Sequence, residues 1–392
     1  MLSRLLGLPR FPFPDTVRRC FGRFTDRHTT DVSEALMRLS LPRLRPTLLG
    51  HTLDLDSPVF CRDGTHEGSR IGHNPIKHGR PSHHPLVAWL SERRRLLWAT
   101  LRAGNAGTAN GVREFLAHAL TLLPTGHRIG LVRADAGFFV TALETRDLPY
   151  IIVARLTPLV QKLGIHRIPE ADWQPVTRGI AVVAVMATLP AWRGQTRRFV
   201  CLRQTLTERP TASGRRLIER PGYTYRVFVT TVPFAAELVT RMYAGRADCE
   251  NRIKELKEDL SLDTFCLQSF DATDAAFRTG CVLYNLLMGV RETVLPSCWF
   301  ERRLRAVRDL VFLVGADLIP HARRLRVRFA VPPEERAEFL ERLRTLSAGL
   351  PIAAQLEWEL SEADDVDQAS TRAPNAVGPT GRPVLQRTGA SP

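Results

Sequence analysis

The sequence contains no apolar run long enough to cross a membrane as a helix, and no N-terminal signal for secretion. Its longest apolar run, Gly179 to Trp192, is shorter than the ~20 residues that a membrane-spanning helix requires, and it contains a proline. The first residues, MLSRLLGLPRFPFP, lack the long uncharged stretch and the small-residue cleavage site of a secretory signal. We therefore expect a soluble, cytoplasmic protein.

Cysteine is scarce and scattered. The seven cysteines of the 392-residue chain include no CxxC pair, and their odd number and wide spacing fit neither a disulfide framework nor a zinc ribbon. Several histidines fall within residues 66–84, but their spacing matches no common zinc site and no paired cysteines accompany them. We expect reduced, packed cysteines and no redox chemistry.

Acidic residues are too few to balance the basic ones. The chain has 55 Lys and Arg against 40 Asp and Glu, which leaves a net charge of +15, and arginine dominates runs such as SERRRLL and HARRLRVRF. A basic surface attracts polyanions, and inside a cell the commonest polyanion is nucleic acid. An arginine-rich composition with ordinary solvated helix faces would give the same balance, so charge alone leaves both interpretations open.

Hydrophobic residues make up 44% of the chain, which is typical of a globular protein, and 392 residues suffice for two or three domains. Strand-like segments at 51–60, 95–104 and 128–139 alternate with a helical pattern at 110–123, which predicts an α/β sheet. β-Branched and aromatic residues then dominate up to about residue 232, where helical patterns return. We expect an N-terminal helical segment (1–48), the first part of an α/β core (49–171), a β-rich insertion (172–232), the second part of the core with C-terminal helices (233–360) and a disordered polar tail (361–392).

Four side chains with an unusual spacing lie within a segment expected to form one helix over about 234–260. Tyr243, Arg246, Glu250 and Lys257 stand at offsets 0, 3, 7 and 14, and a step of ~100° per residue places them at about 0, −60, −20 and −40°. This narrow arc lies beside the apolar stripe of the helix, so we expect its side chains in a cleft at the edge of the core. The alternative is that Arg246 and Glu250 form an ordinary surface ion pair, worth about 0.3–0.5 kcal/mol.

Two further acidic residues follow predicted strands. Asp56 lies towards the end of the first strand, and Asp135 lies at the carboxyl end of a buried strand, just before a glycine turn. With Glu250 they could hold two divalent cations ~4 Å apart, the arrangement used for in-line phosphoryl transfer. Oxygen ligands favour two Mg²⁺ ions, with Mn²⁺ as a substitute. Asp54 shares a strand face with Asp56 and is the alternative first carboxylate.

The motifs LDLDS, LVRADAGFF and YAGRADCENRIKELK, in this order, resemble bacterial insertion-sequence transposases of the DDE superfamily, in the group defined by a Y-(2)-R-(3)-E-(6)-K signature. The four-residue row matches that signature at every spacing, and the resemblance spans about residues 10 to 350. It implies a ribonuclease-H-like catalytic core with a β-strand insertion between the second Asp and the Glu. It also implies that Asp56, Asp135 and Glu250 are catalytic carboxylates that bind the metal ions.

The resemblance implies a transposase that cuts and joins the ends of its own insertion sequence. Its partners would be double-stranded DNA, both terminal inverted repeats and target DNA, and a second copy of the chain, as a homodimer on DNA near the bacterial nucleoid. The row would then contact the DNA backbone, with Arg246 and Lys257 on phosphates and Tyr243 on a phosphate or a sugar. We also expect Lys77 and Arg80, in the histidine-rich loop, to contact phosphates; the alternative is a plain surface loop.

The chain departs from the family pattern at three places. Pro58 stands where family members usually have threonine, Ala136 stands where they often have serine, and the segment before LPRFPFPDTVRRCFGRF is shorter than usual. An alternative function is therefore that of a catalytically inactive or truncated remnant that binds DNA without cutting it. Another is a metal-dependent nuclease on the same fold that cleaves DNA but does not join it.

Overall fold

The structure is a computed structural model, and it describes residues 12–41, 44–74, 77–138, 148–192, 194–206, 222–264, 266–293, 295–309, 314–321, 324–347 and 356–360. The chain divides into two compact units, one of residues 1–293 with 303–305 and one of residues 294–302 with 306–392. The expected disordered tail, 361–392, lies outside the described residues. No described helix is long and apolar enough to cross a membrane.

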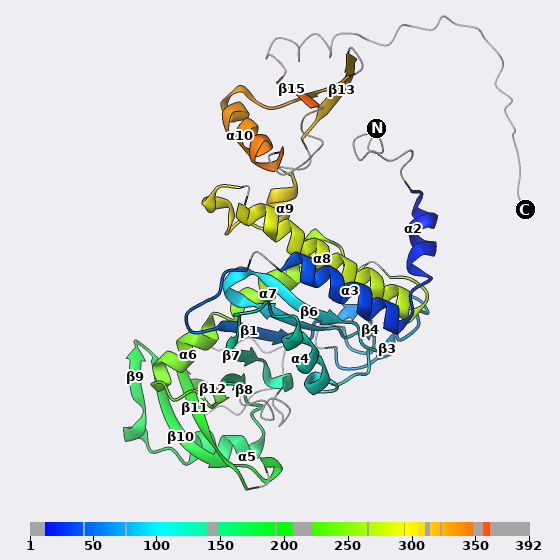
Figure 1. The fold of residues 1–392 in the computed structure, drawn as a ribbon. Helices are drawn as coiled ribbons and strands as arrows, with labels where there is room; N and C mark the ends of the chain where they lie inside the picture. The colour runs from blue at the N-terminus through cyan, green and yellow to red at the C-terminus, as the bar shows by residue number, and fades with distance from the viewer. Residues whose placement is uncertain are drawn as a thin grey trace, which may run out of the picture. The chain divides into compact units, whose positions relative to one another are not determined.

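A nine-stranded mixed sheet forms the centre of the first unit, so the predicted α/β class is confirmed (Figure 1). Its strand order is β6-β5-β1-β7-β8-β12-β11-β10-β9. The strands are β1 (His51–Asp56), β5 (Leu86–Leu90), β6 (Arg95–Thr100), β7 (Ile129–Ala134), β8 (Tyr150–Val153), β9 (Gln174–Thr177), β10 (Ile180–Thr188), β11 (Thr196–Thr205) and β12 (Tyr223–Thr230). β1, β7 and β8 are parallel neighbours, and all other pairs are antiparallel.

Parallel strands are normally buried on both faces, and the centre of this sheet follows that rule. Leu53 and Leu55 of β1 are buried, and every residue of β5 is buried. β9 to β12 lie between residues 172 and 232, where the sequence predicts β structure, and they extend the nine-stranded sheet because β12 pairs with β8. A separate three-stranded sheet, β2-β4-β3, is built from β2 (Phe60–Cys61), β3 (Arg70–Ile71) and β4 (Pro81–His83).

Helices cover the sheet in the first unit. They are α2 (Pro14–Phe21), α3 (Asp26–Ser40), α4 (Val112–Thr121), α5 (Pro158–Gln161), α6 (Ala236–Ala244), α7 (Ala247–Lys254) and α8 (Phe270–Thr293), with short π-helical turns η4 (Lys162–His166) and η7 (Glu255–Asp259). α3 lies beside α8, and α8 packs along β6 (Figure 1). α6 packs on β10 and β11, so the helix that begins the Tyr243 row is held against the β-rich strands.

The second unit has its own small sheet. β14 (Arg324–Phe329) pairs antiparallel with β13 (Ala316–His321) and parallel with β15 (Leu356–Leu360). α10 (Arg336–Ser347) contacts this sheet through the edge-to-face pair Phe339 and Phe329, whose ring centroids are 5.1 Å apart. The short α9 (Leu304–Val307) lies at the junction of the two residue ranges.

Candidate active site

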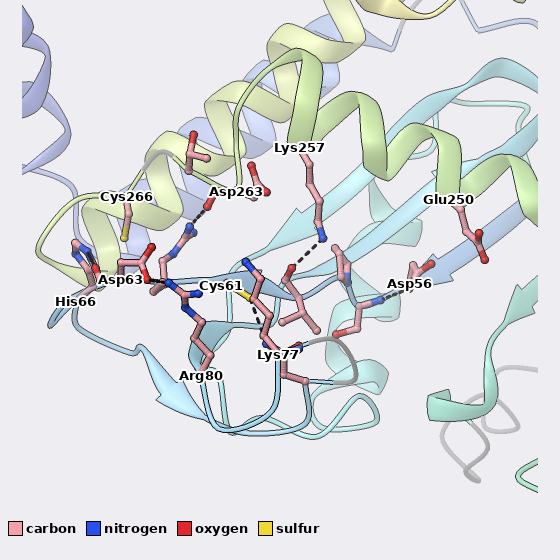
Figure 2. A pocket seen from close by; sticks show the side chains of 16 residues that line it. Asp56, Cys61, Asp63, His66, Lys77, Arg80, Glu250, Lys257, Asp263 and Cys266 are labelled. Atoms are coloured by element: carbon pink, nitrogen blue, oxygen red, sulfur yellow. Dashed lines mark hydrogen bonds and ion pairs between the residues drawn. The ribbon is translucent and has the colours of Figure 1, made fainter. Parts of the chain in front are cut away.

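A cavity of about 780 Å³ opens between the end of β1, the β2-β4-β3 sheet and the α7–η7 helix. Asp56 and Glu250 line one end of it, while Asp63 and His66 lie towards the other (Figure 2). Its cationic lining comes from Arg62, Lys77, Arg80 and Lys257. Carboxylates and cations from three separate parts of the chain therefore meet in one cavity.

Asp56 is the last residue of β1, and its carboxylate is partly buried. Its Oδ1 accepts the backbone N–H of Ser57 at 2.7 Å, and its Oδ2 accepts the Arg246 guanidinium at 2.9 Å. Burial raises the pKa of Asp56; Arg246 opposes this, and the negative charges of Asp135 and Glu250 raise the pKa further. Asp135 and Glu250 are therefore both close enough to Asp56 to repel its charge.

Asp135 directly follows β7, the parallel neighbour of β1. Leu55 pairs with Ala134 in register, so Asp56 and Asp135 leave adjacent strand ends at the same edge of the sheet. The Asp135 carboxylate accepts the backbone N–H of Gly137 at 2.9 Å, which holds it against its own turn. This edge, beyond the carboxyl ends of parallel strands, is where open α/β sheets place ligands.

Glu250 lies exposed on α7 and points towards Asp56 at one end of the cavity (Figure 2). The alternative of an ordinary Arg246–Glu250 pair is wrong, because Arg246 pairs with Asp56 instead and Glu250 forms no ion pair with the described residues. Burial acts to lower the pKa of Arg246, but the ionisable groups around it, Asp56 first among them, together outweigh burial and raise the pKa. Arg246 thus offsets part of the charge at the carboxylate site.

Asp54, the alternative first carboxylate, lies inside the protein. Its side chain is 0% exposed, and its two oxygens accept Arg133 Nε at 2.6 Å and Arg133 Nη2 at 2.8 Å. This bidentate pair occupies the carboxylate of Asp54, whereas that of Asp56 lines the cavity. Of the two aspartates, only Asp56 has an oxygen at the cavity wall.

The single helix predicted over 234–260 is interrupted. α6 ends at Ala244, α7 begins at Ala247, and the π-helical η7 replaces the last α-helical turn. A Cβ on Gly245 would lie 2.7 Å from Arg133 Nη1, so the break passes too close to Arg133 for a larger residue. The 100° spacing of the row therefore holds only within each part of the segment.

Of the row residues expected to contact DNA, Tyr243 is buried and Lys257 lines the cavity. Tyr243 is only 8% exposed; its hydroxyl donates to the Ala134 carbonyl at 3.3 Å and its ring packs on Phe228 at 4.9 Å between centroids. The expected contact of Tyr243 with DNA does not fit this burial, and its position supports the turn that carries Asp135. Lys257 lines the cavity, where its amine donates to the Val59 carbonyl at 2.9 Å and burial lowers its pKa.

The histidine-rich loop places Lys77 and Arg80 in the cavity wall. Lys77 is exposed, and Arg80 forms an ion pair with Asp63. His83 and His84, in contrast, are buried; burial lowers the pKa of His83 to about 4 and also lowers that of His84. The cationic end of the loop therefore faces the cavity, and its last histidines belong to the interior.

Two arginines lie at this edge of the sheet, and none of the sequence motifs indicates them. Arg102 donates from Nη2 to the Ser57 hydroxyl at 2.9 Å, directly beside Asp56. Arg155, which is exposed, donates from Nε to the Ala136 carbonyl at 3.2 Å, directly beside Asp135. Both follow strands of the sheet, β6 and β8, and lie far from the motifs in sequence.

The donor chemistry at this edge suits a hard divalent cation. Asp56, Asp135 and Glu250 offer carboxylate oxygens, which Mg²⁺ prefers over nitrogen or sulfur ligands. Among the residues that the structure describes, no three His, Cys, Asp or Glu side chains are already gathered closely enough to enclose an ion. Burial, with the added repulsion of Asp135 and Glu250, raises the pKa of Asp56, and a bound cation would stabilise its ionised form.

Comparison with known families identifies residues 15–348 as a transposase DDE domain of group 1. The chain belongs to the DDE transposases. Membership implies polynucleotidyl transfer in DNA transposition. The search of curated proteins found no match.

Several solved structures match this DDE transposase. One is the cryo-EM structure of the piggyBac transposase synaptic complex with hairpin DNA, at 13% identity and a TM-score of 0.40. The match covers 90% of the present chain and 63% of that chain, so the present chain spans less than two thirds of that protein.

Proposed function

We propose that this DDE transposase cuts and joins DNA at the ends of its own insertion sequence, as a member of the Y-(2)-R-(3)-E-(6)-K group. The observation that carries the proposal is the meeting of Asp56, Asp135 and Glu250. Two of them leave adjacent parallel strands, the third lies with Asp56 at one end of the cavity, and the charges of Asp135 and Glu250 both act on Asp56. Family membership supports the reaction class, and the geometry supports the residues.

A ribonuclease-H-like core fits the strand order. Three antiparallel strands, β6-β5-β1, continue into the parallel strands β7 and β8, and β12 to β9 extend the sheet beyond them. After Asp135 the chain adds β8 to this order, passes through β9 to β12 and returns to the site at Glu250. We therefore assign residues 172–232 to the insertion, and 49–171 and 233–360 to the two parts of the core and its helices.

In this mechanism the three carboxylates would hold two Mg²⁺ or Mn²⁺ ions. Those ions, when bound, activate the attacking oxygen and stabilise the leaving 3′-oxygen. In cleavage the oxygen of water replaces the 3′-oxygen on phosphorus; in joining a 3′-hydroxyl does so. The chain itself orients the phosphate and limits the charge at the site.

Arg246, Lys257, Lys77 and Arg80 supply the positive charge around the carboxylates. Arg246 forms an ion pair with Asp56, while Lys257 lies in the cavity near Val59. Lys77 and Arg80 line the same cavity from the β3–β4 loop, where they can contact backbone phosphates on either side of the reacting one. Synapsis of two ends would bring two copies of the chain together on double-stranded DNA.

Incubation of the protein with Mg²⁺ and a duplex that carries the element's ends tests the function. Glu250→Gln keeps the side-chain shape but removes a metal-binding charge, so strand cleavage should fall at least ~100-fold while DNA affinity stays the same. The matched control is Glu237→Gln, because the Glu237 side chain on α6 is 43% exposed and pairs with Arg241 at the surface. It should cleave like the wild type.

The outcomes separate the alternatives. Excision with joining supports the transposase, cleavage without joining supports a nuclease, and binding without cleavage by the wild type supports an inactive remnant. Pro58 favours the last outcome, because it lines the cavity beside Asp56 and has no backbone N–H to offer. Equal cleavage by Glu250→Gln and the wild type would refute the assignment of Glu250.

A further inference from the structure

Arg102 has more backbone acceptors than an ordinary surface arginine. Its Nε donates to the His84 carbonyl at 2.9 Å, and its Nη1 donates to the carbonyls of Gly107 at 3.0 Å and Asn110 at 2.6 Å. Nη1 also lies 3.4 Å from the Thr108 carbonyl. These contacts close residues 103–110 into a loop around one guanidinium.

The remaining nitrogen of Arg102 reaches the first catalytic carboxylate through one residue. Nη2 donates to the Ser57 hydroxyl at 2.9 Å, and the Ser57 N–H donates to Asp56 Oδ1 at 2.7 Å. Within the described part of the chain, no carboxylate lies within ion-pair distance of Arg102. Its guanidinium therefore serves neutral acceptors, which is the use that its five fixed donors allow.

The same loop touches the turn that carries the second catalytic carboxylate. A Cβ on Gly137 would lie 2.8 Å from both Cγ2 and Oγ1 of Thr108, so the loop and the turn are in direct contact. The Gly137 N–H holds Asp135 Oδ1 at 2.9 Å. Arg102 therefore contacts Ser57, which follows Asp56, and the loop that it closes contacts Gly137, whose N–H donates to Asp135.

The geometry points to Arg102 as a positioning residue that sets the separation of Asp56 and Asp135 through Ser57 and through the Thr108–Gly137 contact. This inference rests on the proposed function for its catalytic consequence. Two metal ions must lie ~4 Å apart between these carboxylates, so a small change in their separation alters both ion sites together. A misplacement of ~1 Å costs an enzyme about 100-fold in rate.

Hydrogen–deuterium exchange on the whole protein tests this without any need for activity. The reporters are the amides of Ser57 and Gly137, because each donates to one of the two carboxylates. Arg102→Lys keeps the charge but loses the fork of donors, and it should speed exchange of both amides about tenfold. Gly137→Ala should displace Thr108 and speed exchange at Ser57 as well, although Ser57 is not its neighbour.

Arg198→Lys is the matched control. Arg198 also fastens a loop by donating to two backbone carbonyls, those of Val232 and Phe234, each at 2.7 Å, and it lies in β11. It should leave exchange at Ser57 and Gly137 unchanged. If Arg102→Lys speeds exchange only within 103–110, or if Arg198→Lys acts like it, the positioning role is wrong.

Kinetics add the catalytic consequence. If the protein cleaves DNA, Arg102→Lys should lower kcat about 100-fold and leave the KM for DNA unchanged. The reason is that Arg102 contacts none of the cationic residues proposed to bind phosphate. A change in KM alone would contradict positioning. If the wild type does not cleave DNA, the proposed function fails, while the exchange experiment still decides the role of Arg102.

Discussion

Asp54 and Asp56 show how two carboxylates two residues apart acquire different roles. Asp54 faces Arg133 inside the protein, in a bidentate ion pair that satisfies both oxygens. Asp56 faces the cavity, where burial raises its pKa and the charges of Asp135 and Glu250 raise it further. The environment therefore makes Asp54 part of the folded core and makes Asp56 a group that gains from a cation.

This difference predicts that the same substitution, Asp to Asn, lowers stability by very different amounts at the two positions. Asp54→Asn leaves the buried Arg133 charge without its partner and should lower the free energy of unfolding by about 3–5 kcal/mol. Asp56→Asn removes a carboxylate whose ionised form is already disfavoured by burial and repulsion, so it should cost far less. Urea unfolding of both variants measures this. Equal losses of stability would contradict it.

At the level of single residues, sequence spacing predicts which side chains approach the site better than it predicts what they touch. Glu250 and Lys257 both line the cavity, as the row implies. The burial of Tyr243 and the pairing of Arg246 with Asp56 depend on β1 and β7, which lie more than 100 residues away in the chain. Helix periodicity contains no information on such partners.

Within the nine-stranded sheet, β5 is a strand that the sequence patterns miss, as they also miss the strands of the two three-stranded sheets, including the one found where C-terminal helices were expected. The five residues of β5, LVAWL, are all buried, so they show no alternation of polar and apolar side chains. The prolines and histidines just before it favour a loop instead. The break between α6 and α7 is also missed; it lies at Gly245, where Arg133 from a distant segment approaches the backbone closely.

Polar side chains of α8 hydrogen-bond to backbone groups at the β6 edge of the sheet. The Asn285 side chain lies beside β6, where it accepts the Leu96 N–H at 2.8 Å and donates to the Leu96 carbonyl at 2.7 Å. It thereby takes the place of a missing neighbouring strand. Asp274, about three turns away on the same helix, accepts the Leu101 N–H in the same way at 2.8 Å.

Asn285→Ala should therefore destabilise the protein well beyond the loss of one surface contact. It leaves two buried backbone groups of Leu96 without partners, at about 1–3 kcal/mol each, so the free energy of unfolding should fall by about 3 kcal/mol. Chemical denaturation measures the change. The control on the same helix is Leu283→Ala, whose side chain is 46% exposed and should cost below about 1 kcal/mol.

At the scale of the whole molecule, the sequence predicts the α/β class and the β-rich region, but not the continuity of the sheet. The pairing of β8 with β12 joins Ile151 to Thr230 across the whole insertion. Local propensity identifies each strand, whereas the order of strands depends on such long-range contacts. The position of Asp135 next to Asp56 follows from that order and not from either motif.

Buried histidines predict how the whole molecule responds to acid. Burial lowers the pKa of His51, His84 and His118, and lowers that of His83 to about 4. The folded state therefore prefers neutral rings: their contribution to stability is complete above the unfolded pKa of about 6.5 and is lost as the pH falls from there towards 4. The melting temperature should drop between pH 7.5 and pH 5.

A substitution at His83 tests whether protonation of buried histidines causes the acid sensitivity. Its Nδ1 accepts Arg62 Nε at 3.0 Å, so protonation would place two positive charges together. His83→Gln should lower the melting temperature at pH 7.5 but make it less dependent on pH. An unchanged pH profile would assign the acid sensitivity to other groups.

The nine-stranded sheet has only two edges, and both discourage growth of the sheet by a further strand. On β6, the side chains of α8 already occupy backbone groups that a neighbouring chain would need. β9 is only four residues long and includes Pro175, which has no N–H to donate. The central sheet is thus protected at both ends from the edge-to-edge aggregation to which open sheets are prone.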